Sequence, residues 1–401
     1  MSGNLIRAAE TSEILSFDNT EIAFKHKSDE ELNKAYWLFK IMGSPLLVKT
    51  GIPLTNLALN LNLPVISVIK KTIFEQFCGG ENILDCERTI QQLAKGSVGT
   101  ILDYSVEGEE DERAFTATAE EIIHTIKRAQ HDSRIPFTVF KLTGIARFSL
   151  LQKVNTGAEL SAAEQAEYFK VKARVNYICR TAFEFDVPVM IDAEESWIQN
   201  TIDDLALEMM RYYNRENAIV FNTYQLYRRD KLDSLEKDIA TAADFGFILG
   251  AKLVRGAYME KERMRAKELA YRSPIQDDKA STDADYNKAL DVCIKNLSHV
   301  AIVAGTHNED SCLILTELMK KHALAHNHPH IYFSQLLGMS DNLSFNLANA
   351  GYNVAKYVPY GPVKAVMPYL FRRAEENKSI AGQTGRELSL IIKEKKRRRK
   401  S

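Results

Sequence analysis

The chain has 401 residues, of which 45% are hydrophobic and 26% charged, the composition of a soluble globular protein with a sizeable core. Its formal net charge of -1 excludes a global field that would attract nucleic acid, and we predict no nucleic-acid partner. The five cysteines are scattered without a Cys-X-X-Cys pair, and their odd number argues against a disulfide framework. We therefore infer a reducing compartment.

The N-terminal part of the chain carries helical patterns and no targeting signal. Residues 1–24 lack both a charged segment followed by an apolar run and the Arg/Ser-rich character of a transit peptide. The longest apolar run, 51–70, is broken by Pro53 and Pro64 and is unsuited to a bilayer. We therefore expect a cytoplasmic protein of bacterial type, in which residues 1–96 form a helical region packed against the following domain.

From residue 98 onward, short apolar runs alternate with amphipathic helical segments. Near-continuous apolar strands that are each followed by a helix indicate buried parallel strands. Eight such units predict an α/β fold, a TIM-type (β/α)8 barrel with an N-terminal helical layer. A doubly wound open sheet is the alternative, although no Gly-X-Gly-X-X-Gly follows any strand. The expected strands are 98–105, 136–143, 187–194, 218–225, 250–258, 299–308, 330–338 and 353–361.

We divide the chain into a helical region (1–96), a catalytic barrel (97–385) and a basic C-terminal tail (386–401). Residues 393–400 read KEKKRRRK, a local charge of +6, so that the rest of the chain carries -7. Such a tail has three interpretations: a disordered solvated end, a patch for an anionic membrane surface, or a nucleic-acid contact. The membrane interpretation would place the protein at the inner face of the membrane.

Polar side chains lie at the end of one expected strand after another. In a barrel, catalytic groups project from the carboxyl ends of the strands. A single polar residue there is unremarkable because strand ends meet water, but a complete ring predicts a polar pocket at one mouth of the barrel. The ring consists of Asp103, Lys141, Asp192, Glu194, Gln225, Lys252, Arg255, Tyr258, His307, Gln335, Tyr357 and Tyr360.

A second cluster follows the eighth strand in the segment PYLFRRAEEN, residues 368–377. A helix here would direct Tyr369 and one or both of Arg372 and Arg373 to the same side. Paired guanidinium groups suit a carboxylate or phosphate bound in a bidentate manner. The alternative is a solvated helix face on which Glu375 and Glu376 pair with the arginines. The residues alone thus predict a barrel enzyme for a small anionic ligand, with a cofactor rich in hydrogen-bonding groups.

Eight motifs in chain order resemble those of the proline dehydrogenase family: FKLTG, VMIDAE, NTYQLY, KLVRGAY, GTHN, FSQLLGM, YVPYG and PYLFRRAEEN. The resemblance extends over about residues 98–377. It implies a distorted (β/α)8 barrel with FAD at the carboxyl ends of the strands and a last helix that closes the proline site. The implied reaction is hydride transfer from L-proline to FAD, giving Δ1-pyrroline-5-carboxylate. The electrons pass on to a quinone, and the reaction is the first step of proline catabolism.

The resemblance also implies roles for individual residues. Arg372 and Arg373 match the pair that holds the substrate carboxylate, Lys141 matches the lysine that assists them, and Asp192 matches a buried aspartate beside this cluster. Arg255 is expected near the reactive edge of the flavin, so the expected catalytic residues are Arg255, Lys141 and Asp192. The walls around the substrate ring match Leu253, Tyr258, Tyr357 and Tyr369. The flavin-binding positions match Gln225, Lys252, Arg255, Thr282, His307 and Glu376.

Two further positions bear on the stacking environment of the flavin and on substrate specificity. Met259 stands where some relatives carry an aromatic residue against the flavin. Tyr357 favours proline over hydroxyproline, since relatives that prefer hydroxyproline tend to carry a smaller residue there. A dehydrogenase for hydroxyproline or another cyclic imino acid is the alternative function, followed by a barrel without flavin and a Schiff-base or phosphate-binding barrel.

Two further expectations concern metals and additional modules. The histidines of HALAHNHPH, 322–330, lack an acidic or cysteine partner, so we predict no metal site. The resemblance includes no aldehyde dehydrogenase module and no DNA-binding segment. We therefore expect the chain to catalyse the first step only.

Overall fold

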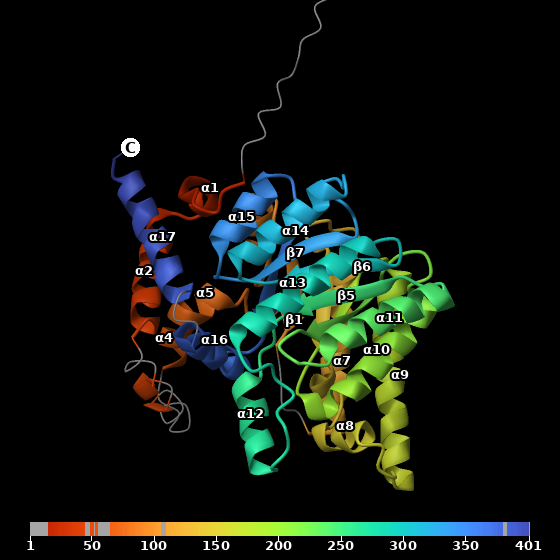
Figure 1. Cartoon of the computed structure of the whole chain (residues 1–401). Coiled ribbons are helices and arrows are strands. Elements are labelled where there is room, and N and C mark those ends of the chain that lie inside the picture. Colours follow the sequence, from red (N-terminus) through yellow and green to blue (C-terminus); the bar gives the residue numbers. More distant parts are fainter. Residues whose placement is uncertain are drawn as a thin grey trace, which may run out of the picture.

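The computed structural model describes residues 15–44, 49–51, 53–54, 65–105, 110–379 and 383–400. Its centre is a closed barrel of eight parallel strands in sequential order (Figure 1), which confirms the predicted (β/α)8 architecture. Seven strands lie within the apolar runs and β5 begins one residue before its run. The agreement arises because parallel strands covered on both faces are apolar nearly throughout. The strands are β1 (Gly99–Tyr104), β2 (Phe137–Lys141), β3 (Val189–Asp192), β4 (Val220–Gln225), β5 (Leu249–Val254), β6 (Val300–Gly305), β7 (Ile331–Leu336) and β8 (Val354–Tyr360).

Helices surround the barrel and connect its strands, as Figure 1 shows. Seven of them follow successive strands as the covering layer: α7 (Glu112–Ala129), α9 (Ala162–Glu184), α10 (Ser196–Tyr213), α11 (Lys231–Phe245), α13 (Lys279–Lys295), α14 (Glu309–Lys321) and α15 (Asp341–Asn349). Three shorter elements are inserted between strands and helices: η2 (Leu142–Gly144), α8 (Phe148–Asn155) and α12 (Met259–Glu268).

The barrel is distorted where its last helix would be expected. The chain continues from β8 into α16 (Met367–Ser379) and α17 (Gln383–Arg398). The apolar side chains of α16 belong to a second core that is separate from the main core between strands and helices. In that second core Tyr369 and Leu370 meet Phe39 and Phe77 from the N-terminal part of the chain. The N-terminal helices therefore pack against α16 in the second core, which Leu336 at the end of β7 also contacts.

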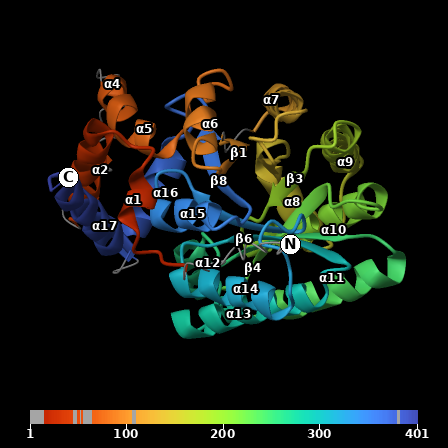
Figure 2. The same ribbon diagram turned by 90° about the horizontal axis from the view of Figure 1, so that it is seen from above.

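The N-terminal layer consists of short helices, as predicted. Ser28 begins the longest of those described, α2, with a reciprocal cap, since its hydroxyl accepts from the Glu31 N–H (3.1 Å) and its own N–H donates to the Glu31 carboxylate (2.9 Å). Figure 2 shows α1, α2, α16 and α17 gathered on one side of the barrel. The helices of the layer within the described residues are α1 (Thr20–Phe24), α2 (Asp29–Met42), α4 (Ile66–Ile69), the π-helical η1 (Lys70–Phe74), α5 (Glu75–Phe77) and α6 (Glu87–Ala94).

The interior of the barrel is closed at the end opposite the predicted site. The ring of Phe137 meets those of Phe221 and Tyr332 edge-on, with centroids 5.4 and 4.8 Å apart. Val139 and Met190 fill the layer above them. Because side chains alternate between the two faces of a strand, the next inward positions carry the polar residues of the mouth. The interior of the barrel is thus filled by apolar side chains, and its mouth is lined by polar ones.

The basic C-terminal segment is helical, so the interpretation as a disordered end is wrong for Gln383–Arg398. Leu390 and Ile391 are buried in the second core, and α17 packs along α2 and α1. The Arg398 guanidinium donates to the carboxylates of Glu394 (2.8 Å) and Asp29 (2.7 Å). It also donates to the carbonyl groups of Phe24, the last residue of α1, and of Lys27 beyond it. Sequence reasoning missed this packing because the partners lie more than 360 residues away along the chain.

A buried ionic cluster ties α17 to the barrel. Asp341 contacts the ammonium groups of Lys356 (3.0 Å) and Lys27 (3.1 Å), and the N–H of Ser340 donates to the Glu387 carboxylate on α17. Burial raises the pKa of Glu387 to about 7, and the nearby Asp341 carboxylate acts in the same direction. The cluster therefore joins the C-terminal helix, α15 and β8 through buried charged groups.

None of the helices within the described ranges is both long and apolar enough to cross a bilayer. The three-part division of the chain remains a prediction.

We predict that Arg398→Ala lowers the free energy of unfolding by about 2 kcal/mol, because it removes two ion pairs and two hydrogen bonds to carbonyl groups. Arg397 still pairs with the buried Glu394, which limits the loss. Urea unfolding followed by circular dichroism measures it. Arg399→Ala, at the exposed next position, is the matched control and should change stability by less than about 0.5 kcal/mol. Equal stability of the two variants would contradict the docking of α17.

From the raised pKa of Glu387 we predict that the stability of the folded protein depends on pH. Between its unfolded pKa of 4.5 and its folded pKa of about 7, the folded protein holds a proton that the unfolded chain has lost. This group's contribution therefore falls by up to about 3 kcal/mol as pH rises through that window. Glu387→Gln should flatten the decline, whereas Glu317→Gln on the exposed face of α14 should not. Identical pH profiles of unfolding for Glu387→Gln and the native chain would show the prediction to be wrong.

Candidate functional site

Three strands place a lysine, an aspartate and a tyrosine in contact at the barrel mouth. The Lys252 ammonium on β5 donates to Asp192 Oδ1 of β3 and to Tyr357 Oη of β8, both at 2.5 Å. The Tyr357 hydroxyl donates to the same Asp192 oxygen at 3.0 Å, and Lys252 Nζ lies 4.3 Å from the centroid of the tyrosine ring. Lys141 of β2 is the register partner of Asp192 on the neighbouring strand. The structure thus brings together four of the predicted residues.

The phenol of this cluster is neutral. Burial raises the pKa of Tyr357 well above its usual value, and the Asp192 carboxylate raises it further. Tyr357 therefore donates its proton to Asp192 and accepts from Lys252 in a fixed arrangement. Asp103 of β1, also buried, adds negative charge near the phenol and accepts a hydrogen bond from Ser105 at 2.6 Å. The mouth accordingly has an ordered pattern of charges and donors.

His307, just after β6, presents a neutral imidazole. Burial lowers its pKa to about 3, and the cations Lys356, Arg373 and Arg255 contribute in that order. The Leu336 N–H points to Nε2 at 3.5 Å, which assigns the remaining proton to Nδ1 and directs it to the Ser340 hydroxyl at 2.9 Å. Sequence reasoning named His307 but missed Ser340, whose left-handed backbone (φ 51°) is recognisable only in the folded chain.

Two predicted polar residues of the third and fourth strand ends hold each other in place. The Gln225 amide donates to the Glu194 carbonyl at 2.7 Å. The Glu194 carboxylate accepts from the N–H of Thr143 (3.0 Å) and from its hydroxyl (2.5 Å). Burial raises the pKa of Glu194 to about 7. Thr143 was not predicted, although the motif FKLTG contains it.

Arg255 is oriented by the helices that follow β5 and β6. Its guanidinium donates to Asp283 on α13 (2.7 Å), to Thr306 (2.8 Å) and to Ser311 on α14 (2.9 Å). Its central carbon lies 4.4 Å from the centroid of the Tyr286 ring. This side chain is therefore fixed, and its positive charge remains near His307, whose pKa it lowers. Thr282, next to Asp283 on α13, is buried and donates to a backbone carbonyl at 3.3 Å.

The helix α16 carries the predicted arginine pair. Arg373 and Tyr369, four residues apart, are both buried, and the guanidinium carbon lies 5.1 Å from the centroid of the tyrosine ring. Arg372 is half-buried. The influence of Arg373 on the pKa of His307 places its charge near the mouth of the barrel. The side chain of Glu376, like that of Glu375, lies outside the described residues.

Leu253 is not at the mouth, contrary to the prediction. It packs with Leu249 and Ala251 in the core between strands and helices. Alternation along β5 places Leu253 on the opposite face from Lys252, so both cannot point into the barrel. Tyr258, half-buried, stands at the residue before α12.

Tyr360 of the sequence-derived ring also points outward. Its hydroxyl bonds Glu121 (2.9 Å) and Thr125 (2.8 Å) of α7. By contrast, Gln335 of β7 is buried and donates to the Thr306 carbonyl at 3.1 Å, beside the segment that holds Arg255.

The histidines of 322–330 have structural contacts. The His326 ring stacks on Tyr352 with centroids 4.3 Å apart, and His330 approaches the Leu297 carbonyl through Nδ1 at 3.2 Å. Within the described ranges, no group of three or more His, Cys, Asp or Glu side chains is arranged to hold a metal ion.

Comparison with solved structures supports the architecture. Proline utilization A (PutA) from Bdellovibrio bacteriovorus aligns with a TM-score of 0.69 over 92% of this chain and 39% of that chain, at 18% identity. A second structure, of a bifunctional PutA protein, aligns with a TM-score of 0.65 over 80% of this chain and 33% of that one. At these identities the likeness concerns the fold, which is the same barrel.

Comparison with known sequences shows to which family the chain belongs. "Proline dehydrogenase 1, mitochondrial" of Dictyostelium discoideum is 32% identical over 430 residues, covering 96% of this chain and 75% of that protein. The human protein of the same name is 42% identical over 238 residues, 59% of this chain and 40% of its own length. "Carbapenem antibiotics biosynthesis protein CarD" of Pectobacterium carotovorum is 33% identical over 80% of this chain and 83% of its own. The family model described as Proline dehydrogenase matches residues 86–386, and the chain belongs to the proline dehydrogenase family.

Proposed function

We propose that the chain is a FAD-dependent dehydrogenase that oxidises L-proline to Δ1-pyrroline-5-carboxylate, the first step of proline catabolism. The observation that carries this proposal is the convergence of the Asp192–Lys252–Tyr357 cluster at the barrel mouth with the charge of Arg373 from α16. Family membership makes proline the first substrate to test.

The two halves of proline require two kinds of contact. Its carboxylate suits the guanidinium groups of Arg372 and Arg373, assisted by the Lys141 ammonium, because charge-assisted pairs of this type fix orientation. Its apolar ring suits aromatic walls, for which Tyr357 and Tyr369 are buried and rigid. We assign Tyr258, at the start of α12, to the outer edge of this wall.

The donor set along β4 to β6 suits a flavin. The Gln225 amide and the cations Lys252 and Arg255 can donate to ring carbonyls and phosphate oxygens. His307 is a neutral imidazole, so its burial does not introduce a third full charge. We assign Thr282 and Glu376 to the same cofactor.

When bound, FAD would supply the two-electron oxidation by accepting a hydride from C5 of the proline ring, and a quinone would remove the electrons. The chain's own contribution is orientation and charge. Lys252 and Arg255 provide positive charge in a water-poor mouth, where such charge stabilises a developing anion more than in bulk water. Asp192 keeps the Lys252 ammonium and the neutral Tyr357 in place.

An absorbance spectrum of the purified protein, repeated without oxygen after addition of L-proline, tests the proposed function. We expect flavin bands that bleach with proline. Bands that bleach only with hydroxyproline would assign the chain to the alternative substrate. A colourless protein that stays inactive after FAD is added would refute the proposal.

Arg373→Gln should raise the KM for proline and lower kcat/KM by about two to three orders of magnitude, because removing one partner of a buried charge pair costs about 2–5 kcal/mol. Flavin content should be retained, which the absorbance of the purified variant verifies. Arg180→Gln, on the exposed face of α9, is the matched control. An unchanged KM for Arg373→Gln would remove this residue from the carboxylate site.

We propose a cytoplasmic protein that attaches to the membrane as a peripheral protein, because a quinone acceptor resides in lipid. Two cations of the tail, Arg397 and Arg398, pair with protein carboxylates, whereas Lys396, Arg399 and Lys400 are exposed. Those three side chains form the proposed patch for anionic lipid.

Lys396→Gln/Arg399→Gln/Lys400→Gln should weaken binding to anionic liposomes by at least about tenfold, at about 1 kcal/mol for each charge near the surface. Activity with a soluble quinone should be preserved, because α17 keeps its docking contacts. Liposome sedimentation measures the binding, with uncharged lipid as the control. Binding unaffected by the triple substitution would rule out this patch.

A further inference from the structure

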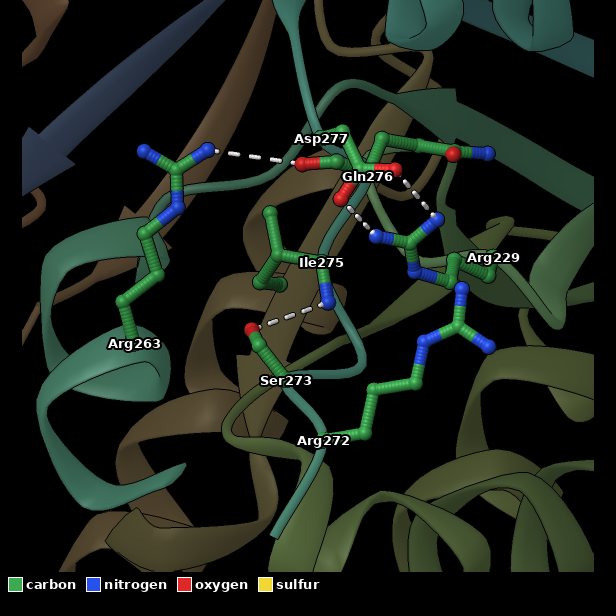
Figure 3. A pocket seen from close by; sticks show the side chains of 7 residues that line it. All are labelled: Arg229, Arg263, Arg272, Ser273, Ile275, Gln276 and Asp277. Atoms are coloured by element: carbon green, nitrogen blue, oxygen red, sulfur yellow. Dashed lines mark hydrogen bonds and ion pairs between the residues drawn. The ribbon is translucent and has the colours of Figure 1, made fainter. Parts of the chain in front are cut away.

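A cavity of about 200 Å³ lies at the rim of the barrel, between the segment after β4 and the connection from α12 to α13. Figure 3 shows Arg263 on one side of Asp277 and Arg229 and Arg272 on the other. Three guanidinium groups thus surround one carboxylate. The residues that line the cavity are Arg229, Arg263, Arg272, Ser273, Ile275, Gln276 and Asp277.

The positive charges of the cavity exceed the negative ones. Arg229 donates through both terminal nitrogens to the Asp277 carboxylate, one of them at 3.2 Å, and this pairing lowers the pKa of Asp277. Arg263 reaches only the Gln276 carbonyl, at 3.4 Å. With the residues that the structure describes, Arg272 forms neither a hydrogen bond nor an ion pair. The lining therefore carries three cations and one carboxylate, a surplus of two positive charges.

Donors buried beside the cavity also lack acceptors. Arg229 Nε is buried without a hydrogen-bond partner among the described residues, and so is Nη1 of the adjacent Arg228, a residue that is only 6% exposed. Buried N–H groups without acceptors are rare in folded proteins, and an unoccupied ligand or ion position is one of their recognised causes. Arg229 belongs to the cavity wall, so an anion there would contact its terminal Nη nitrogens, whereas Arg229 Nε and Arg228 Nη1 are enclosed by protein.

The wall is held in shape by the backbone. Arg229 N–H donates to the Pro274 carbonyl (2.9 Å) and Gln276 N–H to the Tyr227 carbonyl (2.7 Å), which pairs the two connecting segments. Ile275 is buried between them. A preformed wall spares a ligand the entropic cost of ordering it.

We propose that this cavity is a binding site for a phosphate group, separate from the proline and flavin site at the mouth. Guanidinium groups match the oxygen edges of phosphate through paired N–H donors, and two surplus cations balance a dianion. Inorganic phosphate and the phosphate of a nucleotide share this chemistry. The Tyr227 N–H also donates to the Arg255 carbonyl at 2.7 Å, so the site adjoins the segment that positions a predicted flavin contact.

Isothermal titration of the flavin-loaded full-length protein with inorganic phosphate, at constant ionic strength, tests the proposal. We expect saturable binding that chloride does not reproduce. Arg272→Gln and Arg263→Gln should each raise the Kd at least about tenfold. Arg113→Gln, an exposed arginine on α7, should not change it. Absence of binding, or binding unaffected by both cavity variants, would overturn the proposal.

Two comparisons identify the source of the phosphate and separate this site from the flavin site. AMP that binds more tightly than phosphate and displaces it supports a nucleotide ligand, whereas phosphate that binds equally well or better supports the free ion. Phosphate binding that occurs only after FAD is stripped would assign the cavity to the flavin and overturn a separate site. A protein that binds phosphate yet never binds FAD would keep this site and remove the proposed dehydrogenase function.

Discussion

The contact of Lys252 and Tyr357 with one oxygen of Asp192 is the interaction on which the candidate site depends. Removing a lysine and an aspartate from water is costly, and only close mutual contact with satisfied hydrogen bonds offsets that cost. The closed barrel provides the contact by bringing inward positions of β3, β5 and β8 to one level at the mouth. Because three separate strands contribute, correct strand register is a condition for the site to exist at all.

The second constraint is the position of α16. A helix that follows β8 in a regular barrel would cover the outside of the strands, yet α16 belongs to the second core with the N-terminal helices and α17. Two anchors maintain it: the apolar contacts of that core, and the ionic cluster in which Glu387 of α17 meets Ser340. The same Ser340 accepts the proton of His307, so the C-terminal helix is linked to the mouth through a single residue.

Much of the fold was predictable from the sequence. All eight strands coincide with the apolar runs, and only β5 begins one residue earlier, because burial on both faces makes a strand apolar nearly throughout. The predicted site residues Asp192, Lys252 and Tyr357 also converge. Leu253 was misplaced because a motif lists neighbours along the chain, whereas alternation sends adjacent residues of a strand to opposite faces. The docking of α17 and the roles of Ser340 and Glu387 depend on contacts between segments that are distant in the sequence. A local sequence pattern cannot predict such contacts.

The central claim is that proline binds at the barrel mouth with its carboxylate toward α16. The most direct measurement is a crystal structure of the protein with a five-membered cyclic carboxylic acid that cannot be oxidised. The account predicts the ligand carboxylate within hydrogen-bond distance of Arg372, Arg373 or Lys141, and its ring against Tyr357 and Tyr369. A ligand bound elsewhere, with the mouth filled by solvent, would contradict it.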